Sequence, residues 1–164
     1  MINKIGTVII TMFGVGYFKY LPGTLASFLT CLIFYYSEYI YKFNIEYKLI
    51  FLLVFFIFSV ILIDRFIKTK KNKDPKEIVI DEFFGQLVPL YAIWWLSPAS
   101  FWNQHWIIYY SACFILFRFF DTLKPYPINM IDKKIKNGLG VMLDDIVAGV
   151  YTTIIVYGIF VVLR

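Results

Sequence analysis

The chain has 164 residues, of which 60 % are hydrophobic, 21 % aromatic and only 16 % charged. An average soluble domain is about 45–50 % apolar and about 25 % charged, so a soluble domain of this length could not bury so much apolar surface. The composition excludes a secreted module, a disordered regulator and a free cytosolic enzyme, and it predicts a single integral-membrane domain over residues 1–164. The net charge of +5 does not indicate nucleic-acid binding, because no basic stripe alternates with exposed aromatic residues on a polar segment.

Five apolar segments approach the length of about 17–20 residues that a membrane-spanning helix needs, some of them marginally. They cover residues 24–41, 48–63, 83–96 or as far as 102, 106–120 and 146–163. None shows strict alternation of apolar and polar residues, so we expect an all-α, polytopic helical membrane bundle with about five spanning helices. An earlier apolar stretch, residues 5–18, is short and interrupted by Gly14 and Gly16, which predicts a lead-in or re-entrant segment. The N-terminus lacks the layout of a cleaved signal peptide, so we expect this segment to remain in the mature protein.

Charged residues gather on one side of this five-span arrangement. Thirteen of the sixteen Lys and Arg residues lie there, and the positive-inside rule assigns that side to the cytoplasm. Nine of the eleven acidic residues lie on the same side: Asp64, Asp74, Glu77, Asp81, Glu82, Asp121, Asp132, Asp144 and Asp145. Carboxylates at membrane depth are usually paired, solvated in a cavity or bound to a cation. We therefore expect the active site at the cytoplasmic face.

The first candidate site lies where the first spanning helix begins. Pro22 and Gly23 fix a tight turn, and the hydroxyls of Thr24 and Ser27 follow at i and i+3, on one face of the helix. A helix N-terminus with free N–H groups and two hydroxyls can bind an anion. For this motif alone we favour the simpler interpretation, a proline–glycine turn with Thr24 as the N-cap.

The second candidate site is the adjacent acids Asp81 and Glu82 at the start of the third span. Gly85 follows one turn later, where a small residue lets another group approach the backbone. Two adjacent carboxylates repel each other, and a hard divalent cation is one way of keeping both ionised. Compensation of the helix dipole is the alternative, but it explains one acid better than two beside a membrane.

The third candidate site begins at the inner end of the fourth span. Arg118 and Asp121 share a helix face, and Lys124 shares it too if the helix continues to Pro125. An arginine can form two hydrogen bonds with a phosphate, and a lysine can bind it as a point charge. An i,i+3 ion pair with a snorkelling lysine explains this trio equally well.

The same pattern of acids then returns at the fifth span. We expect Asp144 and Asp145 to open this span, and Gly149 follows one turn later, as Gly85 follows the first acid pair. Such a repeat is hard to ascribe to chance. Together the motifs place up to five carboxylates and two cations on one face of the bundle, an arrangement that suits Mg²⁺, which keeps several waters and binds phosphate oxygens. A membrane location makes a lipid phosphate the natural substrate.

Residue types that are absent narrow the chemistry further. His105 is the only histidine and lies in a predicted outer loop, which excludes phosphatases with two catalytic histidines and any Ser-His-Asp triad. The chain has no Asp-x-Asp nucleophile motif and no glycine-rich Walker loop. Cys31 and Cys113 lie within apolar segments, so we expect buried thiols and no disulfide or zinc site.

These residues resemble a known bacterial family, phosphatidylglycerophosphatase A. The similarity runs from about Gly14 to Gly149 and rests on five motifs: Pro22-Gly23-Thr24 with Ser27, residues 78–82 with Gly85, Phe117-Arg118 with Asp121, residues 124–128 with Asp132, and residues 138–145 with Ala148-Gly149. Lys19, Ala26 and Asn137 depart from the family pattern; Ala26 and Asn137 are small or compatible with a turn, so these two affect the local backbone only. The resemblance implies a Mg²⁺-dependent hydrolase of the bacterial inner membrane, which converts phosphatidylglycerophosphate to phosphatidylglycerol in phospholipid biosynthesis.

The resemblance and the residue types together give each motif an expected role. We expect catalytic roles for five carboxylates, Asp81, Glu82, Asp121, Asp144 and Asp145, with all of these except Asp121 as the preferred Mg²⁺ ligands. Arg118 and Lys124 are expected to neutralise the substrate phosphate, and Thr24 and Ser27 are weaker candidates for the same task. Asp132 is either a ligand or a cap of the next turn. One carboxylate acts either as a general base for water or as a nucleophile that forms an aspartyl phosphate, and both mechanisms remain open.

A small cation-coupled transporter is the main alternative, because acids within a membrane can bind a travelling cation. That class predicts polar residues at mid-membrane on several spans, whereas residues 52–56 and 153–156 contain almost none. A non-catalytic assembly subunit would not need both acid pairs beside Arg118 and Lys124. Acids at helix ends favour an enzyme site that faces the membrane surface.

Overall fold

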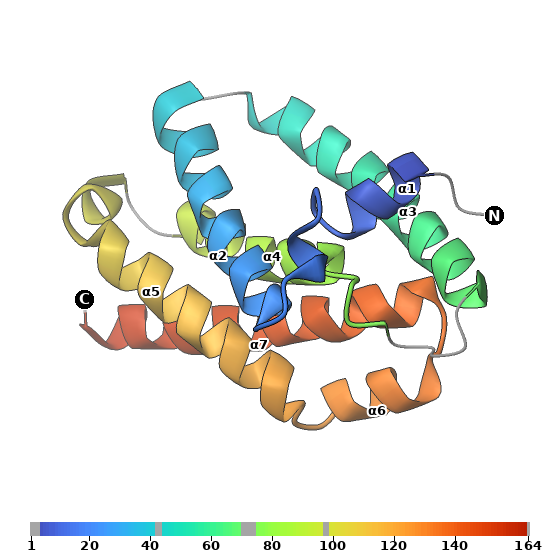
Figure 1. Ribbon diagram of the computed structural model, residues 1–164. Coiled ribbons are helices and arrows are strands. Elements are labelled where there is room, and N and C mark those ends of the chain that lie inside the picture. The colour runs from blue at the N-terminus through green and yellow to red at the C-terminus, as the bar shows by residue number, and fades with distance from the viewer. Residues whose placement is uncertain (1–3, 42–43, 70–74, 97–98, 164) are drawn as a thin grey trace.

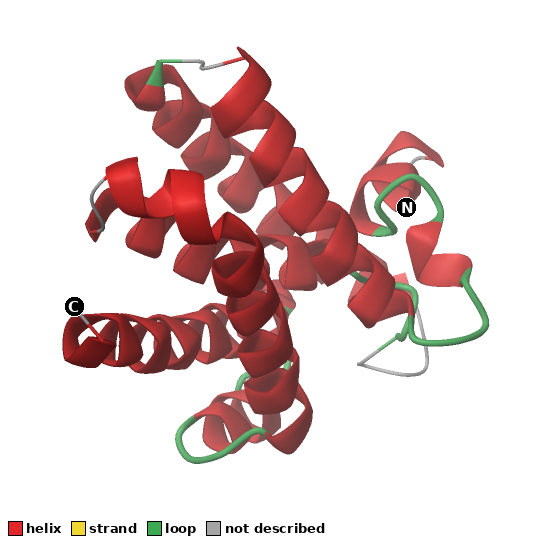
Figure 2. Ribbon diagram, turned by 90° about the vertical axis from the view of Figure 1, so that its left-hand side faces the viewer, coloured by secondary structure: helices red, strands yellow, loops and turns green. Residues whose placement is uncertain are grey.

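The computed structural model describes residues 4–41, 44–69, 75–96 and 99–163, and every regular element in these ranges is helical (Figures 1 and 2). In chain order the elements are α1 (Lys4–Ile10), the 3-10 turn η1 (Val15–Tyr17), α2 (Pro22–Tyr35), the π-helical η2 (Tyr36–Tyr41), α3 (Ile45–Thr69), α4 (Ile80–Leu96), α5 (Ala99–Leu123), α6 (Ile128–Lys134) and α7 (Gly138–Leu163). No strand occurs in the described ranges, which confirms the predicted all-α fold.

Three of these helices are long and apolar enough to cross a membrane by themselves: residues 45–69, 105–123 and 138–162. The helix α2 has only 14 residues before it changes to π geometry in η2, and α4 has 17 and contains Pro89. The apolar helices suit a membrane protein. The count of about five spans is not confirmed by the described helices and stays a prediction.

Two helix boundaries differ from the predicted segments. The helix α7 begins at Gly138 and not at residue 146, because Asn137 caps it: the side-chain oxygen of Asn137 accepts a hydrogen bond from the Gly140 amide at 3.0 Å. Asp144 and Asp145 therefore lie in its second turn, and the prediction that they open the helix was wrong. The third segment ends at Leu96 and does not run on to residue 102, which belongs to α5.

The predicted segment 5–18 forms a short helix and a turn. The helix α1 ends at Ile10, and Met12, Phe13 and Gly14 then adopt positive φ angles of 44°, 56° and 97°, which turn the chain before η1. The Ile10 carbonyl accepts a hydrogen bond from the Val79 amide at 3.0 Å. This bond ties the N-terminal segment to the chain that leads into α4.

The helix α4 occupies the centre of the bundle, packed along α7 and flanked by α2 and α5 (Figure 1). One buried apolar cluster, which includes Ile63, Val79 and Met142, joins α1, α3, α4 and α7. A second cluster includes Phe34 and Leu90 and lies among α2, α4, α5 and α7. It also contains Cys31 and Cys113, which are free buried thiols as predicted. This packing brings the start of α4 next to the first turns of α7.

Candidate active site

Two glycines let α4 and α7 cross in close contact. A Cβ atom on Gly85 would lie 2.8 Å from the carbonyl oxygen of Asp145 and 2.7 Å from the Phe117 ring, and a Cβ atom on Gly149 would overlap the carbonyl oxygen of Gly85. Gly85 and Gly149, which each follow an acid pair in the sequence, thus lie on opposite sides of the same helix–helix contact. The close crossing brings the two acid pairs together.

The acid pairs form a compact cluster of carboxylates. Asp81 and Glu82 lie in the first turn of α4, and one carboxylate oxygen from each lies within 4.8 Å of the other and of an Asp145 oxygen. The two pairs share one local arrangement: Asp81 accepts a hydrogen bond from the Glu82 amide at 3.1 Å, and Asp144 accepts one from the Asp145 amide at 3.2 Å. Asp144 and Asp145 are buried, only 5 % and 3 % exposed. Carboxylates so close and so little solvated need positive charge beside them.

Lys124 supplies part of that positive charge. Its ammonium nitrogen lies 2.6 Å from Asp144 and 3.5 Å from Asp132. Lys124 follows the last residue of α5, where its amide donates to the Phe120 carbonyl at 2.8 Å and its φ of +44° is a conformation that side chains rarely adopt. Burial lowers the pKa of the Lys124 ammonium, but the hydrogen bond to Asp144 and the neighbouring carboxylates raise it more, so this pKa lies above its ordinary value. Lys124 is therefore a stable cation in the cluster.

Arg118 supplies the second positive charge. One guanidinium nitrogen lies 2.6 Å from Asp121 and 3.9 Å from Glu82. The i,i+3 ion pair between Arg118 and Asp121, the alternative to phosphate binding, is thus present. The same arginine also lies near Glu82 of the acid cluster. Gly23 lies directly against this pair, because a Cβ atom there would overlap the Glu82 carboxylate and lie 3.2 Å from Arg118. The start of α2 therefore closes this side of the cluster.

The charged side chains open into a cavity of about 230 Å³. It is lined by most of the predicted residues, together with chain segments that lead into α2 and α4: Pro22, Pro75, Lys76, Ile78, Asp81, Glu82, Asp121, Lys124, Asp132, Val141, Asp144 and Asp145. Lys76 lines the cavity although the motifs did not indicate it as a site residue. Its position five residues before Asp81 was the available signal, hidden among the other basic residues of that segment.

Thr24 and Ser27 are not among the residues that line this cavity. The Ser27 side chain is fully buried, and its hydroxyl donates a hydrogen bond to the Gly23 carbonyl within α2 at 2.9 Å. The N-cap position of α2 is Leu21, because the helix begins at Pro22, so the interpretation of Thr24 as an N-cap was wrong. The backbone of Gly23 lies against the charged cluster, since a Cβ atom there would overlap the Glu82 carboxylate.

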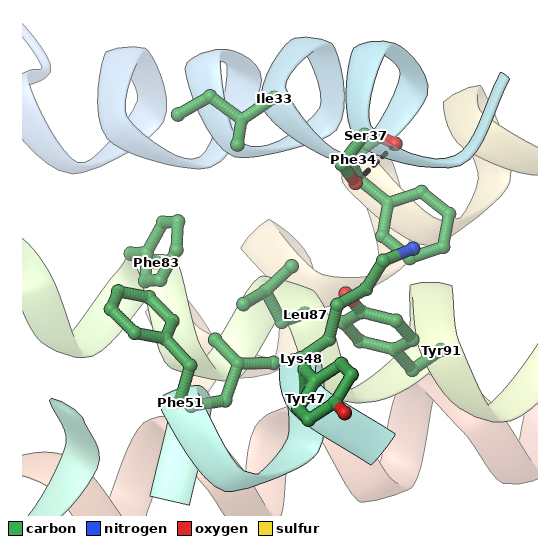
Figure 3. Close-up of a pocket in the computed structure, with 10 residues that line it drawn as sticks. Ile33, Phe34, Ser37, Tyr47, Lys48, Phe51, Phe83, Leu87 and Tyr91 are labelled. Carbon is green, nitrogen blue, oxygen red and sulfur yellow. Dashed lines mark hydrogen bonds between the residues drawn. The ribbon is translucent and has the colours of Figure 1, made fainter. Parts of the chain in front are cut away.

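A larger cavity of about 350 Å³ lies between α2, α3 and α4 (Figure 3). Its walls are mainly apolar, with Phe34, Phe51 and Leu87 among them, and Lys48 at its edge forms a 2.6 Å ion pair with Glu38. None of the described residues that line it carries a carboxylate. The arrangement of opposed carboxylates and cations therefore belongs to the smaller cavity.

Comparison with known proteins gives consistent matches. The model of the phosphatidylglycerophosphatase A family matches residues 8–160. Phosphatidylglycerophosphatase A of Haemophilus influenzae is 46 % identical over 86 residues, which cover 52 % of this chain and 47 % of that protein. The protein of the same name from Escherichia coli K12 is 35 % identical over 145 residues, 88 % of this chain and 77 % of that protein.

A relative from Bacteroides thetaiotaomicron, provisionally named a phosphatidylinositol-3-phosphatase, is 33 % identical over 147 residues, 89 % of this chain and 87 % of that protein. The first of the three alignments thus spans about half the length of the relative, and the other two span more than three quarters. No solved structure matches the chain. Because the family model covers nearly the whole sequence, the chain belongs to the phosphatidylglycerophosphatase A family.

Proposed function

We propose that the protein hydrolyses the terminal phosphate monoester of phosphatidylglycerophosphate, which gives phosphatidylglycerol and inorganic phosphate. Family membership and the two relatives named phosphatidylglycerophosphatase A support this activity. The observation that carries the proposal is the convergence of both acid pairs with Lys124 at one cavity, with Arg118 behind it, 3.9 Å from Glu82. The long apolar helices make a phospholipid an accessible substrate, because enzyme and substrate share the bilayer.

We propose that Asp81, Glu82 and Asp145 hold Mg²⁺. Their carboxylate oxygens lie within 4.8 Å of one another, and hard oxygen ligands are those that Mg²⁺ prefers. One oxygen of Glu82, Oε2, is buried and has no hydrogen-bond partner in the described part of the chain, as a ligand atom kept for a cation would be. When bound, the ion would polarise the phosphate and lower the pKa of a coordinated water. Asp144, the fourth predicted ligand, pairs with Lys124 instead.

Lys124 and Arg118 bind the phosphate group of the substrate in this proposal. Each forms a 2.6 Å ion pair with a carboxylate, to Asp144 and Asp121 respectively. Each cation has further N–H donors, so it can bind a phosphate oxygen while it keeps its carboxylate partner, and no buried carboxylate is left unpaired. The same contacts strengthen as negative charge develops on the oxygen that leaves phosphorus.

A carboxylate of the cluster starts the reaction in one of two ways. As a general base, it takes a proton from the attacking water while the bond from phosphorus to the glycerol oxygen breaks. As a nucleophile, it forms an aspartyl phosphate that water then hydrolyses, which releases phosphate in a second step. In the first route the carboxylate passes that proton to the leaving glycerol oxygen. In the second, the bond from phosphorus to the glycerol oxygen breaks as the aspartyl phosphate forms, and solvent water protonates that oxygen. The lipid product stays in the bilayer in both routes.

We further propose that the cavity faces the cytoplasm across a bacterial inner membrane. The end of the bundle that holds the cavity also carries Lys76 and the three lysines of α6 and its C-terminal side, Lys133, Lys134 and Lys136. Basic residues beside apolar helices favour the cytoplasmic side. Labelling of an introduced Lys134→Cys thiol by an impermeant reagent, from outside intact cells and then after lysis, tests this orientation.

Phosphate release by the detergent-purified protein tests the activity. We expect release from phosphatidylglycerophosphate with Mg²⁺, no release with chelator, and losses of several orders of magnitude in Asp81→Asn and Asp145→Asn. Glu46→Gln, an exposed acid at the far end of the bundle, is the matched control and should retain full activity. Folded wild-type protein that releases no phosphate with Mg²⁺ present would refute the proposal. Parallel assays with phosphatidic acid and phosphatidylinositol 3-phosphate measure the selectivity among lipid phosphates.

A further inference from the structure

The segment between α1 and α2 exposes several large apolar side chains outside the long apolar helices. Of the nine residues 13–21, five are aromatic residues or leucine with at least 61 % exposure: Phe13 89 %, Tyr17 61 %, Phe18 61 %, Tyr20 73 % and Leu21 70 %. Lys19 lies among them with its ammonium 5.3 Å from the centre of the Tyr20 ring. Single exposed apolar residues are ordinary on protein surfaces, whereas a contiguous group marks a contact surface.

The backbone holds these side chains outward in a defined conformation. Met12 and Phe13 have positive φ angles, which are uncommon for residues other than glycine. Hydrogen bonds fix the turn: the Phe13 amide donates to the Val8 carbonyl at 2.8 Å, and the Gly16 amide donates to the Thr11 carbonyl at 3.0 Å. The surrounding structure therefore holds this strained turn in place, and the outward position of Phe13 is a fixed part of the fold.

This segment lies at the mouth of the charged cavity. Gly16 packs against the Glu77 carbonyl so closely that a Cβ atom would overlap it, and Pro22, the next residue after the segment, lines the cavity. The chain that it contacts also contributes Lys76 and Ile78 to the cavity wall. In Figure 1 the same segment, in dark blue, lies beside the start of α2.

We propose that residues 13–21 form an interfacial loop, which inserts its aromatic side chains at the headgroup level of a phospholipid bilayer and holds the mouth of the cavity at the membrane surface. Aromatic residues prefer this level of a membrane, where their apolar bodies are buried and their polar groups stay hydrated. The insertion depth expected for such amphipathic anchors is about 5–10 Å. At that depth the cavity opens where lipid phosphates lie.

A bilayer fits this loop better than a protein partner does. The exposed apolar side chains continue onto the outer face of α2 at Phe28, Leu32 and Ile33, so the loop extends a surface already suited to lipid. Lys19 adds positive charge, which complements anionic phospholipids. The loop therefore joins the lipid-facing surface of the helices to the cavity.

Depth measurements in nanodiscs that hold one copy of the full chain in phosphatidylcholine and phosphatidylglycerol test the insertion. A spin label is attached to Phe13→Cys or Phe18→Cys; the native Cys31 and Cys113 are buried and do not compete for it. Lys134→Cys, exposed on α6, is the aqueous control, and Ile154→Cys, exposed on α7, is the control inside the bilayer. We expect the ratio of oxygen to nickel-chelate accessibility at positions 13 and 18 to lie between the two controls, at a depth of about 5–10 Å.

Nickel-chelate accessibility at positions 13 and 18 equal to that at position 134 would overturn the proposal. So would low accessibility to both reagents, since it indicates burial against protein. Both labelled positions are exposed, so the two variants lose no core packing and provide independent tests. One copy per nanodisc excludes contacts with a second chain.

A second measurement rests on the proposed phosphatase function. The double variant Phe13→Ser/Phe18→Ser should hydrolyse long-chain substrate in vesicles several-fold more slowly than the wild type but act equally on a water-soluble, short-chain phosphate monoester. Tyr47→Ser, another exposed aromatic at the far end of the bundle, should change neither rate. Equal effects on both substrates would contradict the role of the loop. A wild type that hydrolyses neither substrate would refute the phosphatase function instead, and the depth measurement then decides the insertion.

Discussion

Gly85→Ala tests whether the close crossing of α4 and α7 sets the geometry of the carboxylate cluster. The new methyl group would lie 2.8 Å from the Asp145 carbonyl oxygen and 2.7 Å from the Phe117 ring, whereas ordinary van der Waals contact begins at 3.4 Å. The contact with the Asp145 oxygen would thus be 0.6 Å shorter than an ordinary contact. The backbone of α7 must move away from α4 by about that amount, and Asp145 must move with it.

The size of the effect follows from this displacement. A misplacement of about 1 Å in a catalytic group costs about 100-fold in rate, so a shift of about 0.6 Å should lower kcat about tenfold. Overpacking of a core typically lowers the free energy of unfolding by about 1–3 kcal/mol, and alanine, a better helix former than glycine, raises it by up to about 1 kcal/mol. We therefore expect a loss of unfolding free energy of about 0–2 kcal/mol.

Gly158→Ala is the matched control on α7, because a Cβ atom there meets nothing within 4 Å. It should retain wild-type kcat and have equal or slightly higher stability. Phosphate release and thermal unfolding in the same detergent measure both variants. Wild-type kcat in Gly85→Ala would refute the link between the crossing distance and the alignment of the carboxylates.

The other predictions concern the ion pairs. Lys124→Met leaves Asp144 without its cation and should lower the free energy of unfolding by about 2–3 kcal/mol. This is less than the about 3–5 kcal/mol of a fully buried pair, because the lysine side chain is 28 % exposed. Adding Asp144→Asn should restore stability in denaturant titrations but not phosphate release. The difference in unfolding free energy between wild type and Lys124→Met should be constant from pH 7 to about 10. The pKa of Lys124 is higher in the folded protein than in the unfolded chain, where it is about 10.4, so its stabilising contribution is fully present below that pH. The contribution is lost only as pH rises through the pKa of the folded protein. Lys48→Met breaks the buried pair with Glu38 and should cost about 3 kcal/mol in the same titrations, but phosphate release should not change because this pair lies beside the other cavity.

Sequence patterns with a local cause were reliable. Apolar composition and the lack of alternation predicted an all-α fold, because helix formation depends on neighbours a few residues apart. The repeat of an acid pair followed by a glycine indicated close backbone approach, and Gly85 and Gly149 confirm it at one crossing. The motifs also predicted the carboxylates and Lys124 that line the smaller cavity.

Helix boundaries were less predictable. The helix α7 begins at Gly138, eight residues before the predicted start, and this start depends on a single side-chain cap from Asn137. Thr24 was interpreted as an N-cap and, with Ser27, as a weaker candidate for phosphate binding, but the helix begins two residues before Thr24 and uses the Ser27 hydroxyl for its own backbone. Polar side chains can satisfy nearby backbone groups, and sequence spacing does not distinguish that use from ligand binding.

The amino-acid pattern alone was enough to predict which residue types this chain has for chemistry and the motifs in which they are grouped. The pairing of those charges became visible in the packed helices: Lys124 lies against Asp144, twenty residues away, while Asp145 joins Asp81 and Glu82 from another helix. The packed structure also shows that the N-terminal segment presents its aromatic residues outward at the mouth of the cavity. These outcomes depend on the distance between packed helices, which is set by side-chain volumes and glycine contacts far apart in the chain.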